Sequence, residues 1–583
     1  MQSLLYLLAG ILSFVEPVIE RYAPRFVVLS GVSVLMVLMA WLGIILRFVE
    51  RQQHPNPLSR ATESYLQACQ YQLVPWRPWT SATLEDARRL NRLVLVEVGT
   101  FWSGRCAKLG QALYHDSGVA DILKREFVPI KLDADAAPKR ARAMRLIAEQ
   151  LNLPSQEPFI VIFTPEGKPV LAAAPTTRTE LMRLLEQVSL AYRNTPDEVK
   201  AQAQQLETKW TQRWVRAATP VAFTAEDVQQ LNEELLALLE AEASPDWSQP
   251  QPNWLTHTEW LLSLAESGDP RARALLRQRL DALRLSPLWD AQHGGFHTLQ
   301  EGLNMEGKPV GGKRLIENAR LLSLYARASR IDPRFRETAD ALLEFLRVQL
   351  WQARPPGFRA SVAPAPSATT LRPTQPTIKV DPTLYADGNA LAILALLDYV
   401  EHGSLVGSDE RTRWALQAAQ QVMETLRGLR TFRGDLYHST RRQTSDWLPD
   451  LALVALAASR LARQQPSERT LLFAQNLLEL IETHYRDPTG GYYDVAQGKQ
   501  WAGWNLFPIR LSIDTELPAD NALVALAQIE LAQTLKQMHK PAWHSWLQRA
   551  QKTLQVMLGD RPDTLEPFAG FLLAANRWQQ VSF

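Results

Sequence analysis

Four apolar helical segments in the second half of the chain begin with closely similar residues, and this internal repeat constrains the fold most. The aligned positions are Asn318, Asn389, Leu451 and Asn521, which lie 71, 62 and 70 residues apart. A repeat of this length accommodates two helices and a loop, and such units build a core by stacking on their neighbours. Apolar residues recur every three to four positions and strand patterns are almost absent. We therefore predict an all-α (α/α) toroid of six-hairpin type over residues 196–583.

A turn that contains glycine and an aromatic residue precedes each of these helices. The turns are residues 294–297, 357–358, 434–438 and 490–494. The helices themselves open with aspartate, glutamate or asparagine, which are good N-terminal caps. The inner helices of a toroid begin around one mouth, so we expect these residues to surround a pocket there.

The preceding region, residues 77–195, has the pattern of an α/β domain. Apolar runs bounded by turn residues indicate buried strands, and longer stretches with helical periodicity separate them. The predicted strands are residues 92–99, 126–132, 158–163 and 169–172, and the predicted helices are residues 104–115, 137–151 and 180–192. This order of elements resembles the thioredoxin fold.

Three features in register carry that resemblance. Trp102 and Cys106 belong to a turn after the first strand, the second strand ends in Lys-Leu-Asp-Ala-Asp, and Pro158 opens the third strand, where thioredoxins hold a cis-proline. Position 103, however, is serine in place of the first redox cysteine. That cysteine attacks as a thiolate because the helix N-terminus lowers its pKa, whereas a serine hydroxyl is not ionised at neutral pH. Trp102, Ser103, Cys106 and Pro158 therefore form a degenerate redox turn.

Two interpretations of this turn stay open. Cys106 could serve as a single-thiol nucleophile in a monothiol redox or chaperone-like factor. The interpretation that we favour is structural: Ser103 caps the helix, which contributes about 1 kcal/mol, and Cys106 is a small buried apolar residue. The other cysteine is Cys69, and two separate thiols are favoured over a bridge between them.

The N-terminal part of the chain is expected to contact a membrane. Residues 26–46 carry no charge and would span roughly 30 Å as a helix, so we predict a transmembrane helix over residues 26–48. Residues 1–25 contain a shorter apolar segment suited to the membrane interface, and residues 49–76 are predicted to be a linker. Arginines after the span favour a cytoplasmic body, which gives a single-pass protein of a bacterial-type inner membrane.

Composition excludes several classes of function. The chain has 63 basic and 61 acidic residues, and it lacks the basic run interleaved with aromatic residues that a nucleic-acid groove needs. Two cysteines exclude a disulfide-stapled scaffold and a cysteine-based zinc site within one chain. Phosphate-binding loops, zinc-binding His pairs and nucleophile elbows are also absent from the sequence. We expect neither a cofactor nor a metal, and no nucleic-acid partner.

The combination of domains looks like the thioredoxin-domain proteins of unknown function that carry a C-terminal six-hairpin barrel, the family of the spermatogenesis-associated member. The resemblance covers about residues 75–575. Matching residues are Gly294, Gly295, Phe296, His297, Leu315, Asn318, Ala319, Asp387, Asn389, Ala390, Gly490, Gly491, Tyr492, Asp514, Pro518 and Asn521. The barrels of this family are similar to those of sugar 2-epimerases and some glycoside hydrolases.

The chain departs from the family pattern at two chemically important places. Members typically carry Cys-His-Trp-Cys in the turn, where this chain has Ser-Gly-Arg-Cys at residues 103–106. Members also carry Pro-His-Phe-Glu-Lys before the first repeat helix, where this chain has Pro-Val-Gly-Gly-Lys at residues 309–313. The histidine and glutamate that could act as acid and base are therefore Val310 and Gly312. We identify the chain as a degenerate member.

Several acidic and histidine residues still lie in the predicted mouth. The candidates for catalysis are His297, Asp387 and Asp514, besides Cys106 in the turn; Glu317, His438, Asp450 and Asp520 lie nearby. A carbohydrate epimerase or hydrolase needs two such groups at a defined separation across a sugar ring. The capping role of Glu317, Asp387 and Asp520 explains these residues without catalysis and is favoured.

We therefore expect a membrane-anchored protein that is redox-inactive, without enzymatic activity, and that acts as a binding or scaffolding subunit. Its expected partners are the bilayer and other proteins of a membrane complex. The alternatives are a carbohydrate-active enzyme that takes a carbohydrate-like ligand in the toroid mouth, and a monothiol factor that uses Cys106.

Overall fold

The computed structural model describes residues 55–153, 156–214, 217–242, 245–364, 380–403, 410–496 and 508–582. The expected interfacial segment 1–25, the expected membrane helix 26–48 and the start of the expected linker lie outside these residues. Within the described part of the chain, no helix combines the length and the apolar character needed to cross a membrane.

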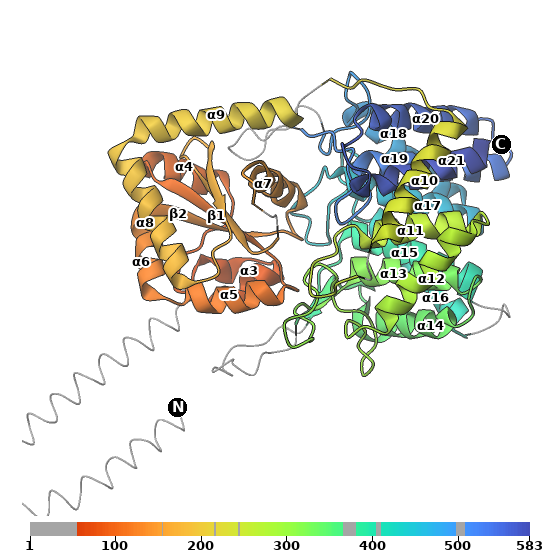
Figure 1. The fold of residues 1–583 in the computed structure, drawn as a ribbon, viewed down its shortest axis with the longest axis horizontal. Coiled ribbons are helices and arrows are strands. Elements are labelled where there is room, and N and C mark those ends of the chain that lie inside the picture. The colour runs from red at the N-terminus through yellow and green to blue at the C-terminus, as the bar shows by residue number, and fades with distance from the viewer. Residues whose placement is uncertain are drawn as a thin grey trace, which may run out of the picture. The chain divides into compact units, whose positions relative to one another are not determined.

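A four-stranded mixed sheet forms the centre of the first domain (Figure 1). Its strands are β1 (Leu93–Gly99), β2 (Phe127–Asp133), β3 (Phe159–Phe163) and β4 (Pro169–Ala173), in the order β2-β1-β3-β4. Strand β1 is parallel to β2 and antiparallel to β3. Alternate residues of β1 enter two different apolar clusters, Leu93 and Leu95 in one and Val94 and Val96 in the other. The sheet is therefore covered on both faces, which explains why its strands are continuous apolar runs.

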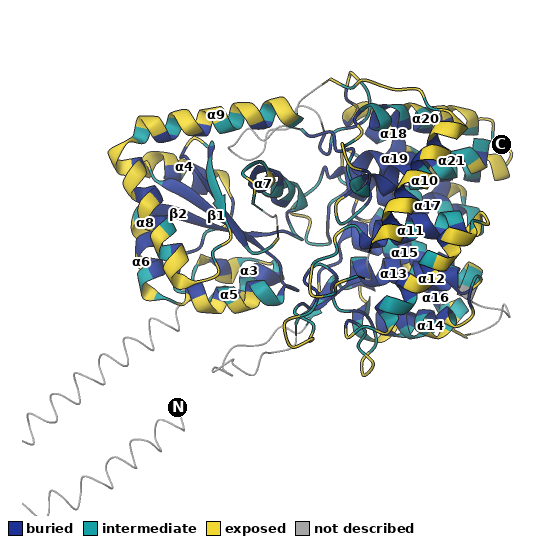
Figure 2. Ribbon diagram, viewed as in Figure 1, coloured by how far each residue is buried: buried dark blue, intermediate teal, exposed yellow. Residues whose placement is uncertain are grey.

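Three helices of this domain match the predicted ones, and two further helices, α4 (Ser81–Leu90) and α6 (Ser117–Glu126), were not predicted. The matching helices are α5 (Gly104–Tyr114), α7 (Pro138–Gln150) and α8 (Arg178–Asn194). Their outward faces carry the exposed residues of the domain (Figure 2). The Ser103 side chain accepts a hydrogen bond from the Cys106 N–H, so Ser103 is the N-cap of α5. The thioredoxin-like α/β fold predicted from the sequence is confirmed.

Two segments differ from the predicted boundaries. Residues 57–76, expected in the linker, form a 3-10 helix η1 (Pro57–Arg60) and α3 (Ser64–Ala68), and their apolar side chains are buried in the core of the first domain. Helix α9 (Pro196–Trp214), expected in the toroid, contacts β4 and α8 and buries Trp210 in the same domain. Both segments pack their apolar side chains into the core of the first domain. That domain therefore extends at least from Pro57 to Trp214.

The second domain is a closed ring of inner helices with a shell of outer helices. The inner helices are α11 (Trp254–Glu266), α13 (Leu315–Ala328), α15 (Ala386–Asp398), α17 (Leu448–Gln464), α19 (Asp520–Gln537) and α21 (Ala569–Ser582). The outer helices are α10 (Ala225–Ala241), α12 (Pro270–Arg284), α14 (Phe335–Phe345), α16 (Glu410–Arg427), α18 (Glu468–His484) and α20 (Trp543–Gly559). Each inner helix contacts the next, and α21 returns to α11. The predicted (α/α) toroid is confirmed.

Short elements connect the helices of the toroid. Strands β5 (Lys313–Arg314), β8 (Ser361–Val362) and β9 (Val380–Asp381) form a small antiparallel sheet, and β6 (Trp351–Ala353) pairs with β7 (Pro356–Phe358). Helix α14 continues into a π-helix η2 (Leu346–Leu350) and α15 into a π-helix η3 (Tyr399–Gly403), while η4 (Glu566–Phe568) is a 3-10 helix before α21.

The repeated asparagine holds the preceding glycine-bearing turn against the start of three inner helices, α13, α15 and α19. The Asn318 side chain accepts the Phe296 N–H at 2.7 Å and donates to the carbonyls of Phe296 and Arg314 at 3.0 and 2.9 Å. Asn389 holds the turn at Phe358, and Asn521 the turn at Tyr492, in the same way. A side-chain amide satisfies three buried backbone groups at each site, which explains the spacing of the repeat.

We predict that Asn318→Ala lowers the free energy of unfolding by about 3 kcal/mol, because three buried backbone groups lose their partners. Urea unfolding monitored by circular dichroism measures this change. Asn194→Ala, at the exposed end of α8, is the matched control and should change stability little. Equal losses in the two variants would contradict the role of Asn318.

Candidate functional site

A carboxylate from the toroid occupies the N-terminus of the thioredoxin-type helix α5. Glu301, in the loop before β5, accepts hydrogen bonds from Ser103 Oγ at 2.5 Å, Gly104 N at 2.8 Å and Arg105 N at 3.2 Å. Helix N-termini bind anions through free N–H groups and the helix dipole. Burial raises the pKa of Glu301, while its contacts with Ser103 and Gly104 oppose that shift. The position at which a redox thiolate would act is therefore filled by the chain itself.

The backbone of the same loop covers the turn. Gly312 N donates to the carbonyl of Trp102 at 2.7 Å. A Cβ atom placed on Gly104 would lie 1.9 Å from the carbonyl oxygen of Val310, and one on Gly312 would lie 2.0 Å from the carbonyl oxygen of Val362. Side chains as large as those of the family pattern have no room at 104 and 312 in this packing. The turn at residues 103–106 and the segment at residues 309–313, where the chain departs from the family pattern, therefore contact each other.

The cysteines are buried and unpaired with each other. Cys106 is 3% and Cys69 is 5% exposed, and neither is part of a disulfide. Burial raises the pKa of the Cys106 thiol well above its usual value, and the nearby charge of Glu97 raises it further. A raised pKa disfavours the thiolate, which is the reactive form.

Pro158 completes the degenerate turn region. The Glu157–Pro158 peptide bond is cis, as the thioredoxin resemblance implies. Glu157 pairs with Arg145 of α7 at 2.6 Å, so the residue before the proline is tied to a helix of its own domain.

A second contact between the domains is centred on His438. Its Nδ1 lies 2.9 Å from a carboxylate oxygen of Asp450, at the start of α17, and its Nε2 lies 2.8 Å from the carbonyl oxygen of Asp135, just after β2. Two acceptors at the two ring nitrogens require both to carry hydrogen, as in the imidazolium. The charge of Asp450 accordingly raises the pKa of His438 to about 9, against burial, which lowers it.

Asp387 extends this pair to a group with the composition of a metal site. Ligand atoms of Asp387, His438 and Asp450 all lie within 4.8 Å of one another, and all three residues are buried. A metal would need a lone pair on a ring nitrogen of His438, and both nitrogens face acceptors. The arrangement fits an ion pair better than a metal centre.

Two arginines complete the junction between the mouth and the first domain. Arg142 of α7 forms an ion pair with Asp520, at the start of α19, and lies 4.1 Å from the ring centroid of Trp447. Arg314 forms an ion pair with Glu516 and stacks on Trp102, 4.2 Å from its ring. The starts of the inner helices are thus occupied by groups that the first domain supplies or contacts.

The predicted catalytic residues are engaged separately. His297 bonds through Nδ1 to the carbonyl of Gly311 at 2.9 Å, and Asp387 accepts the N–H of Gly388 at 2.6 Å. Asp514 accepts the N–H groups of Ala519 at 2.9 Å and Gly570 at 2.7 Å, and burial raises its pKa to about 7. These contacts link Asp514 to the starts of α19 and α21.

The residues that join the domains most directly were not predicted from the sequence. Glu301 and Arg142 have no periodicity or motif that distinguishes them from surface residues. Asp135 was part of a recognised sequence, but its contribution is a main-chain carbonyl, which no sequence pattern reveals. Arg314 stands next to a repeat helix, and its position could have indicated a buried role.

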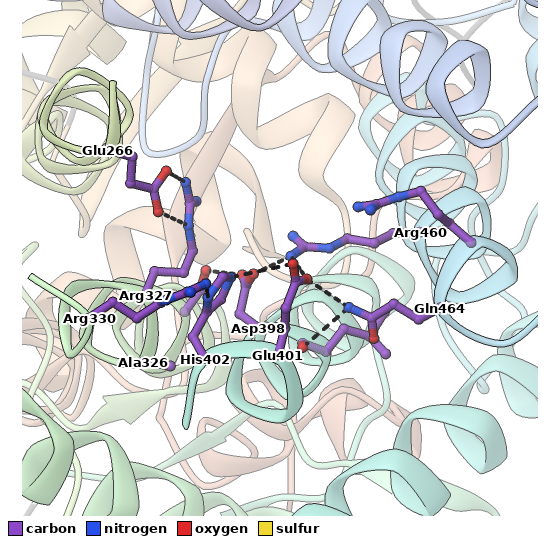
Figure 3. A network of polar contacts seen from close by, with 12 residues as sticks. Glu266, Ala326, Arg327, Arg330, Asp398, Glu401, His402, Arg460 and Gln464 are labelled. Atoms are coloured by element: carbon purple, nitrogen blue, oxygen red, sulfur yellow. Dashed lines mark hydrogen bonds and ion pairs between the residues drawn. The ribbon is translucent and has the colours of Figure 1, made fainter. Parts of the chain in front are cut away.

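The opposite ends of the inner helices carry a separate polar network (Figure 3). Arg327 pairs with Glu266 at 2.5 Å, and Arg460 pairs with Asp398 and with Glu401, the latter at 3.3 Å. Arginines at helix C-termini also offset the negative end of the helix dipole. A pocket of about 320 Å³ beside the network is lined by Val400, Glu401, Leu416, Arg463, Gln464, Gln465 and Gln537.

Residues 55–211 match the family Thioredox_DsbH, described as a protein of unknown function, DUF255. Human spermatogenesis-associated protein 20 is 22% identical over 347 residues, an alignment that covers 56% of this chain and 43% of the human protein. The chain thus spans less than half the length of that relative.

Several solved structures are similar to part of this chain at low sequence identity. A D-mannose isomerase is 12% identical with a TM-score of 0.43, covering 57% of this chain and 85% of that one. Cellobiose 2-epimerase from Spirochaeta thermophila is 13% identical with a TM-score of 0.44, covering 61% and 98%. A GH76 α-mannanase from Bacteroides thetaiotaomicron is 11% identical with a TM-score of 0.43, covering 61% and 95%.

The His438 pair predicts a pH dependence of stability. The folded chain keeps a proton on His438 up to about pH 9, whereas the unfolded chain releases it near 6.5. Stability from this group is therefore complete below pH 6.5 and is lost as the pH rises through 9, by about 3 kcal/mol at most.

Urea unfolding at pH 7 and pH 9 tests this expectation. Wild-type stability should fall more steeply between these values than that of His438→Gln. The variant His544→Gln, at an exposed histidine, should retain the wild-type slope. A His438→Gln variant with the wild-type slope would show that His438 is not charged in the folded protein.

Proposed function

We propose that this chain, whose residues 55–211 match the DUF255 family of proteins of unknown function, is a redox-inactive, membrane-anchored binding or scaffolding subunit. The family assignment comes without a known activity, so the proposal depends on the geometry of the degenerate turn. Its central observation is the Glu301 carboxylate, which bonds to Ser103, Gly104 and Arg105 at the start of α5.

That contact supports a structural use of the first domain. In a dithiol enzyme the start of α5 must be accessible to the partner's disulfide, and its positive electrostatic field must stabilise a thiolate. Here the field stabilises an internal carboxylate, and Ser103 is 1% exposed. The turn joins the two domains instead of presenting a reactive group.

The burial of Cys106 disfavours the monothiol alternative. The thiol is 3% exposed and its pKa is raised, so neither access nor ionisation favours attack on a partner.

The occupied mouth disfavours a carbohydrate-active enzyme. A sugar ring would have to enter between acidic groups at the starts of the inner helices. Arg142 bonds to Asp520 there, and the carbonyl of Asp135 bonds to His438. Either contact would have to break before a ligand could reach these groups.

The apolar residues 26–46 support the membrane part of the proposal, with an inner membrane and proteins of a membrane complex as the expected surroundings. We predict that the full-length chain stays in the membrane fraction after extraction with alkaline carbonate. A variant that lacks residues 1–48 should appear in the soluble fraction. Release of the full-length chain by carbonate would contradict a membrane-spanning anchor.

The substitution Ser103→Cys tests the redox part of the proposal. It restores two cysteines at the spacing of a dithiol turn, but the new thiol would face the Glu301 carboxylate in a buried position, which raises its pKa and blocks access. We expect the variant to reduce insulin with dithiothreitol no faster than wild type, while a thioredoxin assayed in parallel is active. Turnover of insulin by S103C well above wild type would show that the turn is accessible.

A further inference from the structure

Among the buried side-chain atoms without hydrogen-bond partners are four oxygens, on residues at the end of β2, in the small sheet of the toroid and just before α15. They are Oδ2 of Asp133, Oδ2 of Asp381, Oγ of Ser361 and the phenol oxygen of Tyr385. The four residues are 3%, 1%, 1% and 7% exposed, respectively. Buried polar atoms are nearly always paired, so a group of unpaired ones indicates a bound water, ion or ligand.

The small sheet of the toroid places two of these atoms on one face. Arg314 of β5 is opposite Ser361 of β8, which is in turn opposite Asp381 of β9. Directly opposed residues of antiparallel strands project from the same face. Asp381 Oδ1 accepts hydrogen bonds from the hydroxyls of Ser64 and Thr383, both at 2.7 Å. These bonds fix the carboxylate and leave Oδ2 without a partner.

The first domain brings Asp133 to the same place. Oδ1 of Asp133 accepts two main-chain N–H groups just after β2, and Oδ2 is left unpaired. Gly99 is opposite Asp133 in the sheet, and a Cβ atom there would lie 2.2 Å from the hydroxyl of Tyr65. Helix α3, which supplies Ser64 to Asp381, therefore packs against the strand end that carries Asp133.

Tyr385 adds a neutral oxygen to the group. The Thr383 hydroxyl donates to Asp381, and the same side chain lies close to the phenol and lowers its pKa. Burial raises the pKa of Tyr385, and the charges of Asp381 and Asp133 raise it further. The phenol oxygen therefore lies within the electrostatic reach of both carboxylates.

Arg441 approaches this group only through Thr383, whose hydroxyl accepts from the guanidinium and donates to Asp381. Among the described residues, no Lys, Arg or His nitrogen lies within 4.0 Å of a carboxylate oxygen of Asp133 or Asp381. The nearby Arg314 pairs with Glu516 and lies 3.8 Å from Asp135. A buried carboxylate without a counter-charge is costly, and a water molecule would satisfy the hydrogen bonds without balancing the charge.

We infer that a hard divalent cation of the Ca²⁺ or Mg²⁺ type binds between the domains, with Oδ2 of Asp133 and of Asp381 as its charged ligands. The hydroxyl oxygens of Ser361 and Tyr385 are its neutral ligands, and water completes the coordination. Ions of this class prefer oxygen ligands, and Ca²⁺ accepts irregular arrangements more readily than Mg²⁺. The site contains no sulfur or imidazole ligand, which disfavours the softer transition metals.

This cation would bind β9 of the toroid to β2 of the thioredoxin-like domain. The site uses none of Glu301, Ser103 or Cys106, so it stands whether or not the chain is redox-inactive. If no cation binds here, the proposal that the turn at residues 103–106 is redox-inactive is unaffected.

Metal content and thermal unfolding of the purified full-length protein test the inference. Protein prepared without chelator should contain about one equivalent of Ca²⁺ or Mg²⁺ by mass spectrometry. Removal with EDTA should lower Tm by about 2 °C or more, and adding back 1 mM CaCl₂ or MgCl₂ in separate samples should restore it and identify the preferred ion. KCl at equal ionic strength should not restore Tm.

The substitution Asp381→Asn keeps the Oδ1 acceptor for Ser64 and Thr383 and replaces the unpaired Oδ2 by an amide. We expect D381N to lose the bound ion and the response of Tm to EDTA. Asp116→Asn, at the N-cap of α6, should keep both. If D381N does not fold, Ser361→Ala should weaken the response at low CaCl₂. The inference would be overturned if the wild-type protein contains no metal and its Tm does not change with CaCl₂, MgCl₂ or EDTA. That result would indicate bound water at the site.

Discussion

The packing of the thioredoxin-like domain against the toroid depends on the hydrogen bonds between Glu301 and the start of α5. An exposed helix N-terminus has free N–H groups and a partial positive charge, and in a thioredoxin this field serves the attacking thiolate. In this chain the helix start binds a carboxylate from the toroid instead, through donors on Ser103, Gly104 and Arg105. The same physical property that makes a dithiol reactive here holds two domains together.

This contact explains why two sites depart from the family pattern together. Gly104 faces the backbone at Val310, and Gly312 donates to Trp102 while it lies against Val362. Larger side chains at 104 or 312 would force the loop away from the turn and separate Glu301 from α5. Glycine at positions 104 and 312 is therefore required for the loop and the turn to pack together. The loss of the catalytic side chains of the family pattern follows from this packing. His438, Arg142 and the inferred cation site extend the same junction across the mouth of the toroid.

The sequence predicted the regular elements well, because strand and helix periodicities are local properties. The repeat at Asn318, Asn389 and Asn521 even has a common structural cause, the amide that holds each turn. Helix α9 was assigned to the toroid because its periodicity does not show which core it enters. The junction itself was not predictable: Glu301 lies in a loop, Asp135 acts through its carbonyl, and the partners of Ser361 and Asp381 are distant in sequence.

Hydrogen exchange at the start of α5 tests the central claim most directly. The amides of Gly104 and Arg105 both donate to Glu301, so a peptide covering residues 101–107 should be strongly protected in the full-length protein. Glu301→Ala should accelerate exchange in this peptide at least about tenfold, corresponding to about 1.4 kcal/mol, while peptides of β1 and β2 keep their wild-type rates. Rapid exchange of this peptide in wild type, or unchanged exchange in the variant, would contradict a turn closed by the toroid.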